Sequence, residues 1–196
     1  MTDQSLPVLR IIIGSTRPGR VGLPVGTWFI EQATAYGGFD VRVTDLAELN
    51  LPLMDEPVHP IQQKYTRQHT FDWSAAIAGT DAFVFVIPEY NHSFTAPVKN
   101  AIDFLVKEWG FKPVGLVTYG GFSGGLRAAQ ALKLVLVNLR MSVVAEAVTI
   151  PFMATMITEA DAVKVFEPTD HVRHQVKPML DELARQDPVL RQLRRS

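Results

Sequence analysis

The fold is decided by VLRIIIGSTRPGR, residues 8–20. Its first six residues, Val8–Ile13, form an almost continuous apolar run that ends at Gly14, which is the pattern of a strand buried on both faces. A turn rich in Gly, Ser and Pro follows. Beyond it, apolar side chains recur at helical spacing, and Pro24 is tolerated only in the first turn of a helix. We therefore expect a buried strand, a tight turn and a helix that begins near Leu23.

The alternation of strands and helices continues along the chain. Asp40–Asp45 alternates polar and apolar residues, which predicts a half-exposed strand near a sheet edge. Residues 82–87, closed by Pro88, predict a strand buried on both faces, and two more strands are predicted over 114–118 and 142–150. Residues 46–60 hold three prolines and are expected to form a loop.

One helix is expected to end near Gly79, before the third strand, and three more helices follow it. Thr95 is placed as an N-cap with Pro97 in the first turn. The buried stripes of the first two of these three helices are predicted to be Val98, Ile102 and Leu105, and then Leu126, Ala129, Leu132 and Leu136. The third of them is expected over 170–186, where Pro178 kinks or splits it.

Five strands that alternate with helices predict an α/β fold with a parallel sheet between two helical layers. Right-handed crossovers leave few topologies, and the commonest at this length is the flavodoxin-like three-layer sandwich with strand order 2-1-3-4-5. We expect residues 1–196 to form a single domain of this kind. In this order the first, third and fourth strands end at the same edge of the sheet, where ligands bind in such folds.

Composition excludes several classes of function. The chain holds 19 Lys and Arg against 20 Asp and Glu, a formal net charge of -1, which argues against a nucleic-acid clamp or a polybasic membrane binder. The absence of Cys excludes disulfides and thiolate metal sites. His171 and His174 could share a helix face but lack a third ligand nearby, so no metal site is expected. Without a secretory pattern or an apolar run of about 18 residues, we expect a cytoplasmic protein.

The loop over 14–22 has the composition of a phosphate pocket. Ser15 and Thr16 offer hydroxyls, Arg17 and Arg20 offer positive charge, and the backbone amides at a helix start favour an anion. A Walker A loop is excluded because Arg20 and Val21 replace its Lys and its magnesium-holding hydroxyl. The dinucleotide motif Gly-x-Gly-x-x-Gly is also absent. A single phosphate therefore fits this loop better than a pyrophosphate.

Two further loops follow the third and fourth strands. In 88–94, Tyr90 offers a surface for a flat ring and Asn91 an amide for the edge of a heterocycle, although Tyr90 could equally pack against a neighbour. In 118–125, four glycines within six residues allow close approach of the main chain to a ligand, although such a loop can also be a flexible turn. The three loops together suit a flat heterocycle on a phosphorylated chain, which describes FMN.

Three motifs resemble those of the NADPH-dependent FMN reductase family: Pro-Glu-Tyr-Asn at 88–91, Lys-Asn-Ala-Ile-Asp at 99–103 and Gly-Gly-Leu-Arg-Ala at 124–128. That family includes quinone, chromate and azo reductases with a flavodoxin-like fold, and the resemblance spans roughly residues 8–150. It implies that Ser15, Arg17 and neighbouring amides hold the FMN phosphate. The contacts that it implies for the ribityl chain and the ring are Pro88, Glu89, Tyr90, Asn91, Tyr119, Gly120 and Gly121. The chain departs from the family at Arg20 and Gly22, where many members carry Ser and Asn; Arg20 is expected to replace them as a phosphate partner, with Thr16 beside it.

The resemblance implies an FMN-dependent NAD(P)H oxidoreductase that transfers two electrons in a ping-pong reaction. Quinones, azo compounds, metal oxyanions such as chromate, and flavins are all acceptors that an open flavin face would admit. NADPH or NADH is the implied reductant. Because the flavin carries the chemistry, we expect no catalytic side chain, and we expect Glu89 to be mainly structural.

Two other functions remain open at the level of the sequence. Gly121-Phe122-Ser123-Gly124-Gly125 matches the Gly-x-Ser-x-Gly motif of serine hydrolases, with His171 or His174 as a partner. Against this, Asp170 and His174 fall on one helix, and no His-Gly-Gly-Gly oxyanion element is present. A non-catalytic FMN-binding electron carrier is the other alternative, although such carriers are usually strongly acidic.

The sequence also makes predictions about assembly. Phe104, Trp109 and Phe111 cannot all join the buried stripe of their helix, so we expect an apolar patch on the outside of the monomer. Such a patch, together with the resemblance, predicts a homodimer or a tetramer with this helix and the Tyr90 loop close to the contact. The alternative is that Trp109 and Phe111 fold under the loop that follows. Arg191, Arg194 and Arg195 are expected to form a solvated tail.

Overall fold

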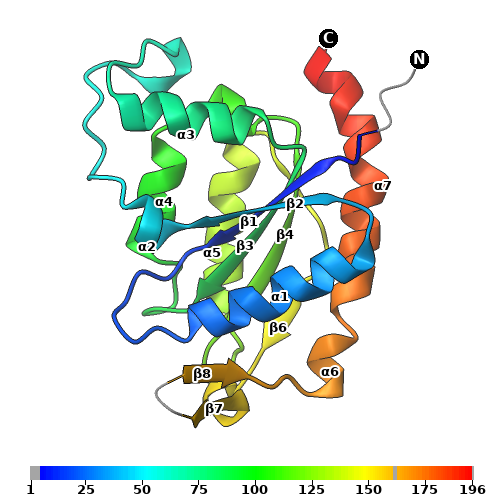
Figure 1. The fold of residues 1–196 in the computed structure, drawn as a ribbon. Helices are drawn as coiled ribbons and strands as arrows, with labels where there is room; N and C mark the ends of the chain where they lie inside the picture. Colours follow the sequence, from blue (N-terminus) through cyan, green and yellow to red (C-terminus); the bar gives the residue numbers. More distant parts are fainter. Residues whose placement is uncertain (1–4, 161–162, 196) are drawn as a thin grey trace.

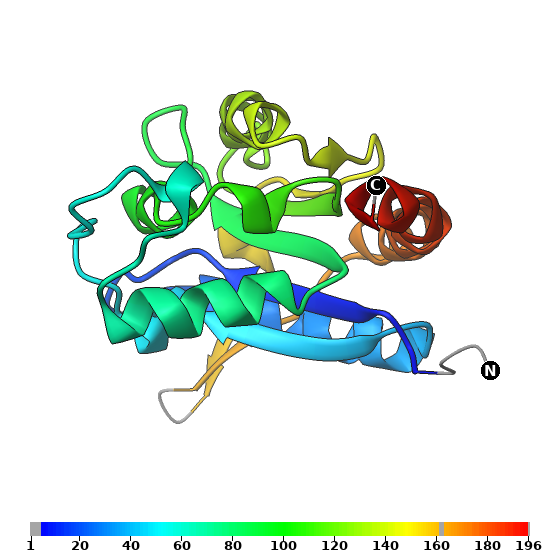
Figure 2. The same ribbon diagram turned by 90° about the horizontal axis from the view of Figure 1, so that it is seen from above.

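The computed structural model describes residues 5–160 and 163–195, and its centre is a parallel sheet between two layers of helices (Figures 1 and 2). The main strands are β1 (Val8–Ile13), β2 (Asp40–Asp45), β3 (Ala82–Pro88) and β4 (Pro113–Tyr119). They are hydrogen-bonded in the order β2-β1-β3-β4-β5, and every pair in this sheet is parallel. This order confirms the flavodoxin-like topology predicted from the sequence.

The last expected strand, over 142–150, is broken into two short pieces. β5 (Ser142–Val143) pairs with the start of β4, and β6 (Val148–Ile150) pairs with its end. Between them Ala145 and Glu146 are exposed to solvent, so the chain leaves the ladder and returns to it. The prediction of one continuous strand was therefore wrong, although both pieces lie where that strand was expected.

Each face of the sheet is covered by its own helices. α1 (Gly22–Tyr36) and α7 (Val176–Arg195) pack on one face, and α3 (Gln68–Ala78), α4 (Ala96–Asp103) and α5 (Leu126–Asn138) pack on the other. β3 and β4 are buried along their whole length because they lie at the centre of the sheet, which explains their continuous apolar sequence. α1 ends at Gly37, whose left-handed conformation is the usual stop signal of a helix.

The helix after β3 begins as predicted, with Thr95 as the N-cap residue and a proline in the first turn. The Thr95 hydroxyl donates to the Gly14 carbonyl at 2.6 Å instead of capping its own helix. Val98 and Ile102 of its predicted stripe are buried, and so is Leu105, although Leu105 lies beyond the end of α4. In α5 the buried stripe begins only at Ala128, since Leu126 is 52% exposed.

The connection over 46–60 was expected to be a loop but contains regular structure. α2 (Leu46–Leu49) is capped by Asp45, whose carboxylate accepts from the Ala47 amide at 3.0 Å. A short 3₁₀ helix, η1 (Pro60–Gln62), follows at the end of the segment. The remainder of the segment is irregular.

The C-terminal region differs from the sequence prediction in two ways. The break between α6 (Asp170–Arg173) and α7 lies before Pro178, which occupies the first turn of α7, where proline is tolerated. The expected arginine tail is instead the last turn of α7. Arg194 Nη2 donates to Asp187 Oδ1 and to Asp81 Oδ1, both at 3.1 Å. The Arg195 side chain and Ser196 lie outside the described residues.

The expected aromatic patch on the outside of the monomer is absent. Phe104 and Trp109 are fully buried, and the Trp109 indole donates to the Ile102 carbonyl at 3.2 Å. The 3₁₀ helix η2 (Lys107–Trp109) turns Trp109 inward, where its ring lies 5.1 Å from that of Phe83. Phe111 is half-buried, under the Arg140 guanidinium. The aromatic residues thus fold under the η2 segment, and the prediction of their exposure was wrong.

A short 3₁₀ helix, η3 (Met153–Met156), is followed by a hairpin outside the main sheet. This hairpin was not predicted from the sequence. It consists of β7 (Ile157–Ala160) and β8 (Val163–Phe166), which pair in antiparallel fashion. Phe166 of β8 packs edge-on against Trp28 of α1 at 5.3 Å between ring centroids. In Figure 1 the hairpin lies below α1, at the edge where β3 ends.

Candidate functional site

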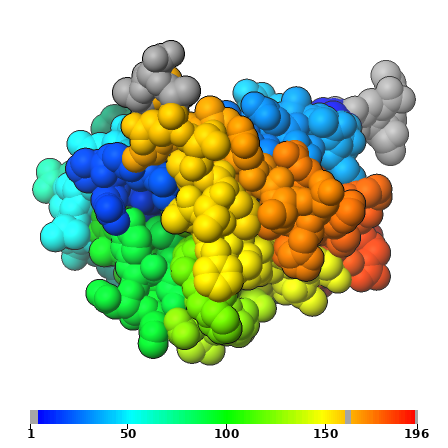
Figure 3. Space-filling view, turned by 90° about the horizontal axis from the view of Figure 1, so that it is seen from below, coloured from blue at the N-terminus to red at the C-terminus, as the bar shows by residue number. Residues whose placement is uncertain are grey.

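The three loops singled out in the sequence meet at the carboxyl edge of the sheet and enclose a cavity of about 180 Å³. The strand register explains the meeting, because Ile13 pairs with Val86 and Pro88 pairs with Tyr119. Figure 3 looks onto this edge, where the dark blue residues after β1 are bordered by the green segment after β3 and the yellow segment after β6. The cavity is lined by Ser15, Arg17, Gly19, Arg20, Val21, Pro88, Glu89, Tyr90, Tyr119, Gly120 and Met153.

Eight of the predicted site residues belong to this lining. They are Ser15, Arg17, Arg20, Pro88, Glu89, Tyr90, Tyr119 and Gly120. Thr16 lines a neighbouring cavity of about 410 Å³ between α2 and α4, and Asn91 and Gly121 line neither. Met153, which follows the last strand of the sheet, was not predicted because it belongs to none of the three loops.

Asn91 has a conformational role in its loop. Tyr90 and Ser93 exchange backbone hydrogen bonds, both at 2.9 Å. The two residues between them, Asn91 and His92, have φ values of 49° and 65°. This is the pattern of a tight turn with two left-handed residues, where Asn is favoured. The turn directs Tyr90, which is 39% exposed, along the rim of the cavity.

The carbonyl groups of the first loop are held by donors from several elements. The Gly14 carbonyl accepts from Thr95, the Ser15 carbonyl from Arg20 Nη1 at 2.6 Å, and the Gly19 carbonyl from Lys164 Nζ at 2.8 Å. Within the loop, the Arg20 amide donates to the Arg17 carbonyl at 3.0 Å across a turn with Pro18 and the positive-φ Gly19. These bonds occupy four carbonyls of the loop and hold its backbone in place.

Several amides of the same loop have no partner among the described residues. In the part of the chain that the structure describes, the N–H groups of Thr16, Arg17 and Gly19 make no hydrogen bond. Within the same residues, the exposed Arg17 side chain has neither an ion pair nor a hydrogen bond. A loop in which four carbonyls already accept hydrogen bonds while three amides are free presents positive electrostatic potential, and this arrangement suits an anion.

Arg20 differs from Arg17 because it is already paired. Both of its terminal nitrogens donate to the carboxylate of Asp45 at the end of β2, and the two side chains are only 14% and 5% exposed. The hydrogen bond to Asp45 raises the pKa of Arg20, so its charge is permanent. Arg20 therefore braces the loop against β2, and its expected contact with a phosphate stays a prediction.

Tyr119 explains why glycine stands at position 22. A Cβ atom at Gly22 would lie 2.3 Å from the Tyr119 hydroxyl, so any larger residue would collide with it. That hydroxyl is buried and has no hydrogen-bond partner among the described residues. Burial raises the pKa of Tyr119 well above its usual value, so the group stays a neutral donor. An unsatisfied donor beside Ser15 and the free amides is itself an indication of a missing polar ligand.

Glu89 ties the second loop to the third. Its carboxylate accepts from Ser123 Oγ at 2.8 Å, from Arg127 Nη1 at 2.7 Å and from the Arg127 amide at 3.1 Å. Burial opposes ionisation, but the hydrogen bonds from Ser123 and Arg127 lower the pKa of Glu89 below its ordinary value. No histidine among the described residues bonds to Ser123. The serine of the Gly-x-Ser-x-Gly motif therefore holds a loop together and lacks the base that a hydrolase nucleophile needs.

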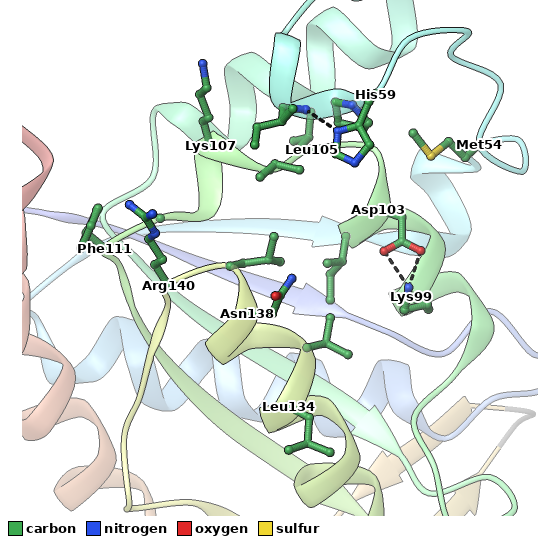
Figure 4. A pocket seen from close by; sticks show the side chains of 17 residues that line it. Met54, His59, Lys99, Asp103, Leu105, Lys107, Phe111, Leu134, Asn138 and Arg140 are labelled. Carbon is green, nitrogen blue, oxygen red and sulfur yellow. Dashed lines mark hydrogen bonds and ion pairs between the residues drawn. The ribbon is translucent and has the colours of Figure 1, made fainter.

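A larger cavity, of about 1080 Å³, lies away from these three loops (Figure 4). α4 and α5 form its walls with the connection that carries Met54 and His59. Lys99 and Asp103 form an ion pair within it at 2.5 Å, and Leu134 reaches it from α5. Among the residues that the structure describes, no group of His, Asp and Glu side chains could hold a metal ion. None of the described helices is long and apolar enough to cross a membrane.

Comparison with known proteins is consistent with this geometry. The family model described as NADPH-dependent FMN reductase matches residues 8–155. An NAD(P)H-dependent FMN reductase of Schizosaccharomyces pombe is 42% identical over 139 residues, which cover 70% of this chain and 69% of that protein. The NAD(P)H-dependent FMN reductase ntnL of Nectria sp. is 37% identical over 152 residues, or 74% and 76% of the two chains.

A solved structure supports the fold independently. The flavoenzyme FerB of Paracoccus denitrificans, an NAD(P)H:(acceptor) oxidoreductase, superposes with a TM-score of 0.69 over 93% of this chain and 98% of its own. The identity of 18% restricts this likeness to the fold.

Proposed function

Because this chain belongs to the NADPH-dependent FMN reductase family, we propose that it binds FMN in the three-loop cavity and reduces a small acceptor with electrons from NAD(P)H. The observation that carries the proposal is the first loop, where the amides of Thr16, Arg17 and Gly19 and the side chain of Arg17 have no partner among the described residues. A phosphate monoester is the anion that such a loop at a helix start is suited to hold.

The residues present fit the phosphate end of FMN. Ser15 is buried beside the cavity, with its hydroxyl 3.3 Å from that of Tyr90, and Arg17 can swing onto an anion without breaking an existing bond. The buried hydroxyl of Tyr119 has no hydrogen-bond partner among the described residues and would gain one from the phosphate. These three side chains and the loop amides would hold the phosphate.

The residues beyond the phosphate loop would hold the rest of the cofactor. The cavity of about 180 Å³ is small, so the ring would lie along its rim, over Pro88 and Tyr90. Gly120 and Gly121 would approach its polar edge. Open space for the ring lies beside Gly121, where an added Cβ atom would meet nothing within 4 Å. When bound, FMN supplies the hydride chemistry. The chain orients it and leaves one face open for NAD(P)H and the acceptor to use in turn.

The acceptors that we propose are quinones first, with azo compounds, metal oxyanions such as chromate, and flavins as alternatives. Quinones stand first because relatives include an NAD(P)H:quinone oxidoreductase of Solanum tuberosum, 38% identical over 103 residues. An FMN-dependent NADPH-azoreductase of Staphylococcus haemolyticus is more distant, at 28% identity over 123 residues. We further propose that residues 1–196 act as one FMN-binding domain in the cytoplasm.

We propose that the protein assembles as a homodimer or a tetramer through the outer face of α5. The aromatic residues first expected to mark the contact are buried, but Leu134 and Val137 of α5 are 77% and 63% exposed. Leu134 also lines the cavity of about 1080 Å³, to which Met54 and Ile61 add further exposed apolar surface. Apolar area of this kind on one face favours an interface between copies of the chain.

An absorbance spectrum of the purified protein after incubation with FMN tests the proposal. We expect a bound flavin that is released by denaturation, tighter binding of FMN than of riboflavin, and NAD(P)H oxidation that depends on an added quinone. Equal affinity for FMN and riboflavin would contradict the phosphate site. Bound FMN with only slow NAD(P)H oxidation would favour the electron carrier instead.

A further inference from the structure

The hairpin β7–β8 brings a lysine to the outer end of the first loop. Lys164 of β8 donates from Nζ to the Gly19 carbonyl at 2.8 Å, although 145 residues separate the two. The family model ends at residue 155, so this contact lies outside the part of the chain that the family match covers. Gly19 itself lines the three-loop cavity.

The hairpin is anchored to the helix that the first loop starts. Phe166, two residues after Lys164, is buried and packs against Trp28 of α1. On the other side, the Glu167 amide donates to the Met156 carbonyl at 2.8 Å and closes the hairpin onto η3. The hairpin that carries Lys164 is therefore packed against α1, the helix that begins at the end of the first loop.

Within the described part of the hairpin, Lys164 forms no ion pair. Glu159 stands directly opposite it on β7, in the register of the antiparallel pair, yet the described residues contain no ion pair between them. The ammonium instead rests on a neutral carbonyl. Its hydrogen bond therefore holds a positive charge at Gly19, whose own amide makes no hydrogen bond among the described residues.

We infer that Lys164 is a specificity-determining residue, which makes the site favour a flavin that carries a phosphate monoester over one that does not. The inference rests on the proposed function, because the phosphate is that of FMN. The carbonyl of Gly19 positions the ammonium, and the ammonium adds to the attraction that the loop amides and Arg17 exert on a dianion. Riboflavin has no charge at that end and gains nothing from it.

Titration of FMN and of riboflavin, each followed by flavin fluorescence, tests this with three variants. Lys164→Gln keeps an N–H donor for the Gly19 carbonyl and removes the charge. Lys164→Arg keeps both. Lys64→Gln removes the charge of an exposed lysine that lines neither cavity of the site edge.

We expect Lys164→Gln to weaken FMN binding roughly five- to tenfold, as for a partly solvated charge pair, and to change riboflavin binding less than about twofold. Lys164→Arg and Lys64→Gln should match the wild type with both flavins. An unchanged FMN-to-riboflavin ratio in Lys164→Gln, whether both affinities hold or both fall together, overturns the inference alone. A wild-type protein that does not distinguish the two flavins overturns the proposed phosphate site and this inference with it.

Discussion

Ser123 Oγ donates a hydrogen bond to Glu89 Oε2 at 2.8 Å, although the two residues belong to different loops. Glu89 directly follows β3, and Ser123 lies in the glycine loop after β4. The bond therefore joins two sides of the candidate site. The same carboxylate also accepts from the amide and the side chain of Arg127 at the start of α5. Ser123 is thus one of the anchors of this carboxylate.

Replacement of Ser123 by Ala should leave NAD(P)H–quinone turnover within about twofold of the wild type. It should lower the free energy of unfolding by about 1 kcal/mol, the usual net worth of one hydrogen bond. Turnover and denaturant unfolding measure the two effects. Ser142→Ala, which removes a serine bond to Gln186 at 2.7 Å, is the matched control. Loss of an esterase activity in Ser123→Ala would instead identify a hydrolase.

Replacement of Arg17 by Ala should weaken FMN binding by about 1.5–3 kcal/mol, as expected for a hydrogen bond to a charged group. Riboflavin binding should not change, because Arg17 has no partner to lose in the described part of the chain. Fluorescence titration measures both affinities. Arg42→Ala removes an exposed arginine that pairs with Asp40 and should have no effect. Undiminished FMN affinity in Arg17→Ala would mean that Arg17 merely lies in solvent.

Replacement of Asp45 by Asn should disturb the first loop through Arg20, which pairs with Asp45. Arg20 would lose its carboxylate, and loss of one partner of a largely buried pair costs about 1–3 kcal/mol after allowance for the partial exposure of Arg20. We also expect weaker FMN binding, since Arg20 holds the Ser15 carbonyl. Thermal unfolding and FMN titration measure this. Asp40→Asn, in an exposed pair, should cost less than about 1 kcal/mol.

The double replacement of Leu134 and Val137 by Asp should abolish the oligomer. Two charges on the exposed face of α5 would oppose an apolar contact there. Light scattering should give a mass of at least twice 21.8 kDa for the wild type and 21.8 kDa for the variant. Val189→Asp, on the exposed side of α7, should stay oligomeric. A wild-type mass of one chain would refute the assembly altogether.

Lys112 should make the stability of the protein rise between about pH 7 and pH 10. Burial, together with the Arg194 guanidinium, lowers the pKa of Lys112 to about 7. Over this range the unfolded chain still binds the proton that the folded chain has released, so a higher pH favours folding. Unfolding free energies of wild type and Lys112→Met should diverge as pH rises, with the wild type gaining. Parallel curves would contradict the shift, and Lys64→Met serves as the exposed control.

The sequence was sufficient for the strand order and for most of the residues that line the three-loop cavity, because both depend on local patterns. Buried strands such as β3 are continuous apolar runs, and the loops at their carboxyl ends meet by topology alone. Eight of the predicted site residues therefore line one cavity. Asn91 does not line the cavity. Its residue type instead suits the left-handed backbone conformation that the turn requires.

What the sequence did not reveal depends on contacts between distant segments. Trp109 is buried because η2 turns it onto Phe83, a contact that helical periodicity does not describe. The position of Lys164 follows from the packing of Phe166 on Trp28, more than 130 residues away. The Arg194 side chain likewise donates a hydrogen bond to Asp81 only because α7 runs the length of the sheet.

The occupied carbonyls of the first loop have a thermodynamic consequence. Thr95, Arg20 and Lys164 have already fixed the backbone from Gly14 to Gly19, so an arriving anion has little conformational entropy left to remove. Association at this loop should then carry only a small entropic penalty, because the backbone is ordered during folding. Loss of any of these three donors should appear in calorimetry as a less favourable binding entropy.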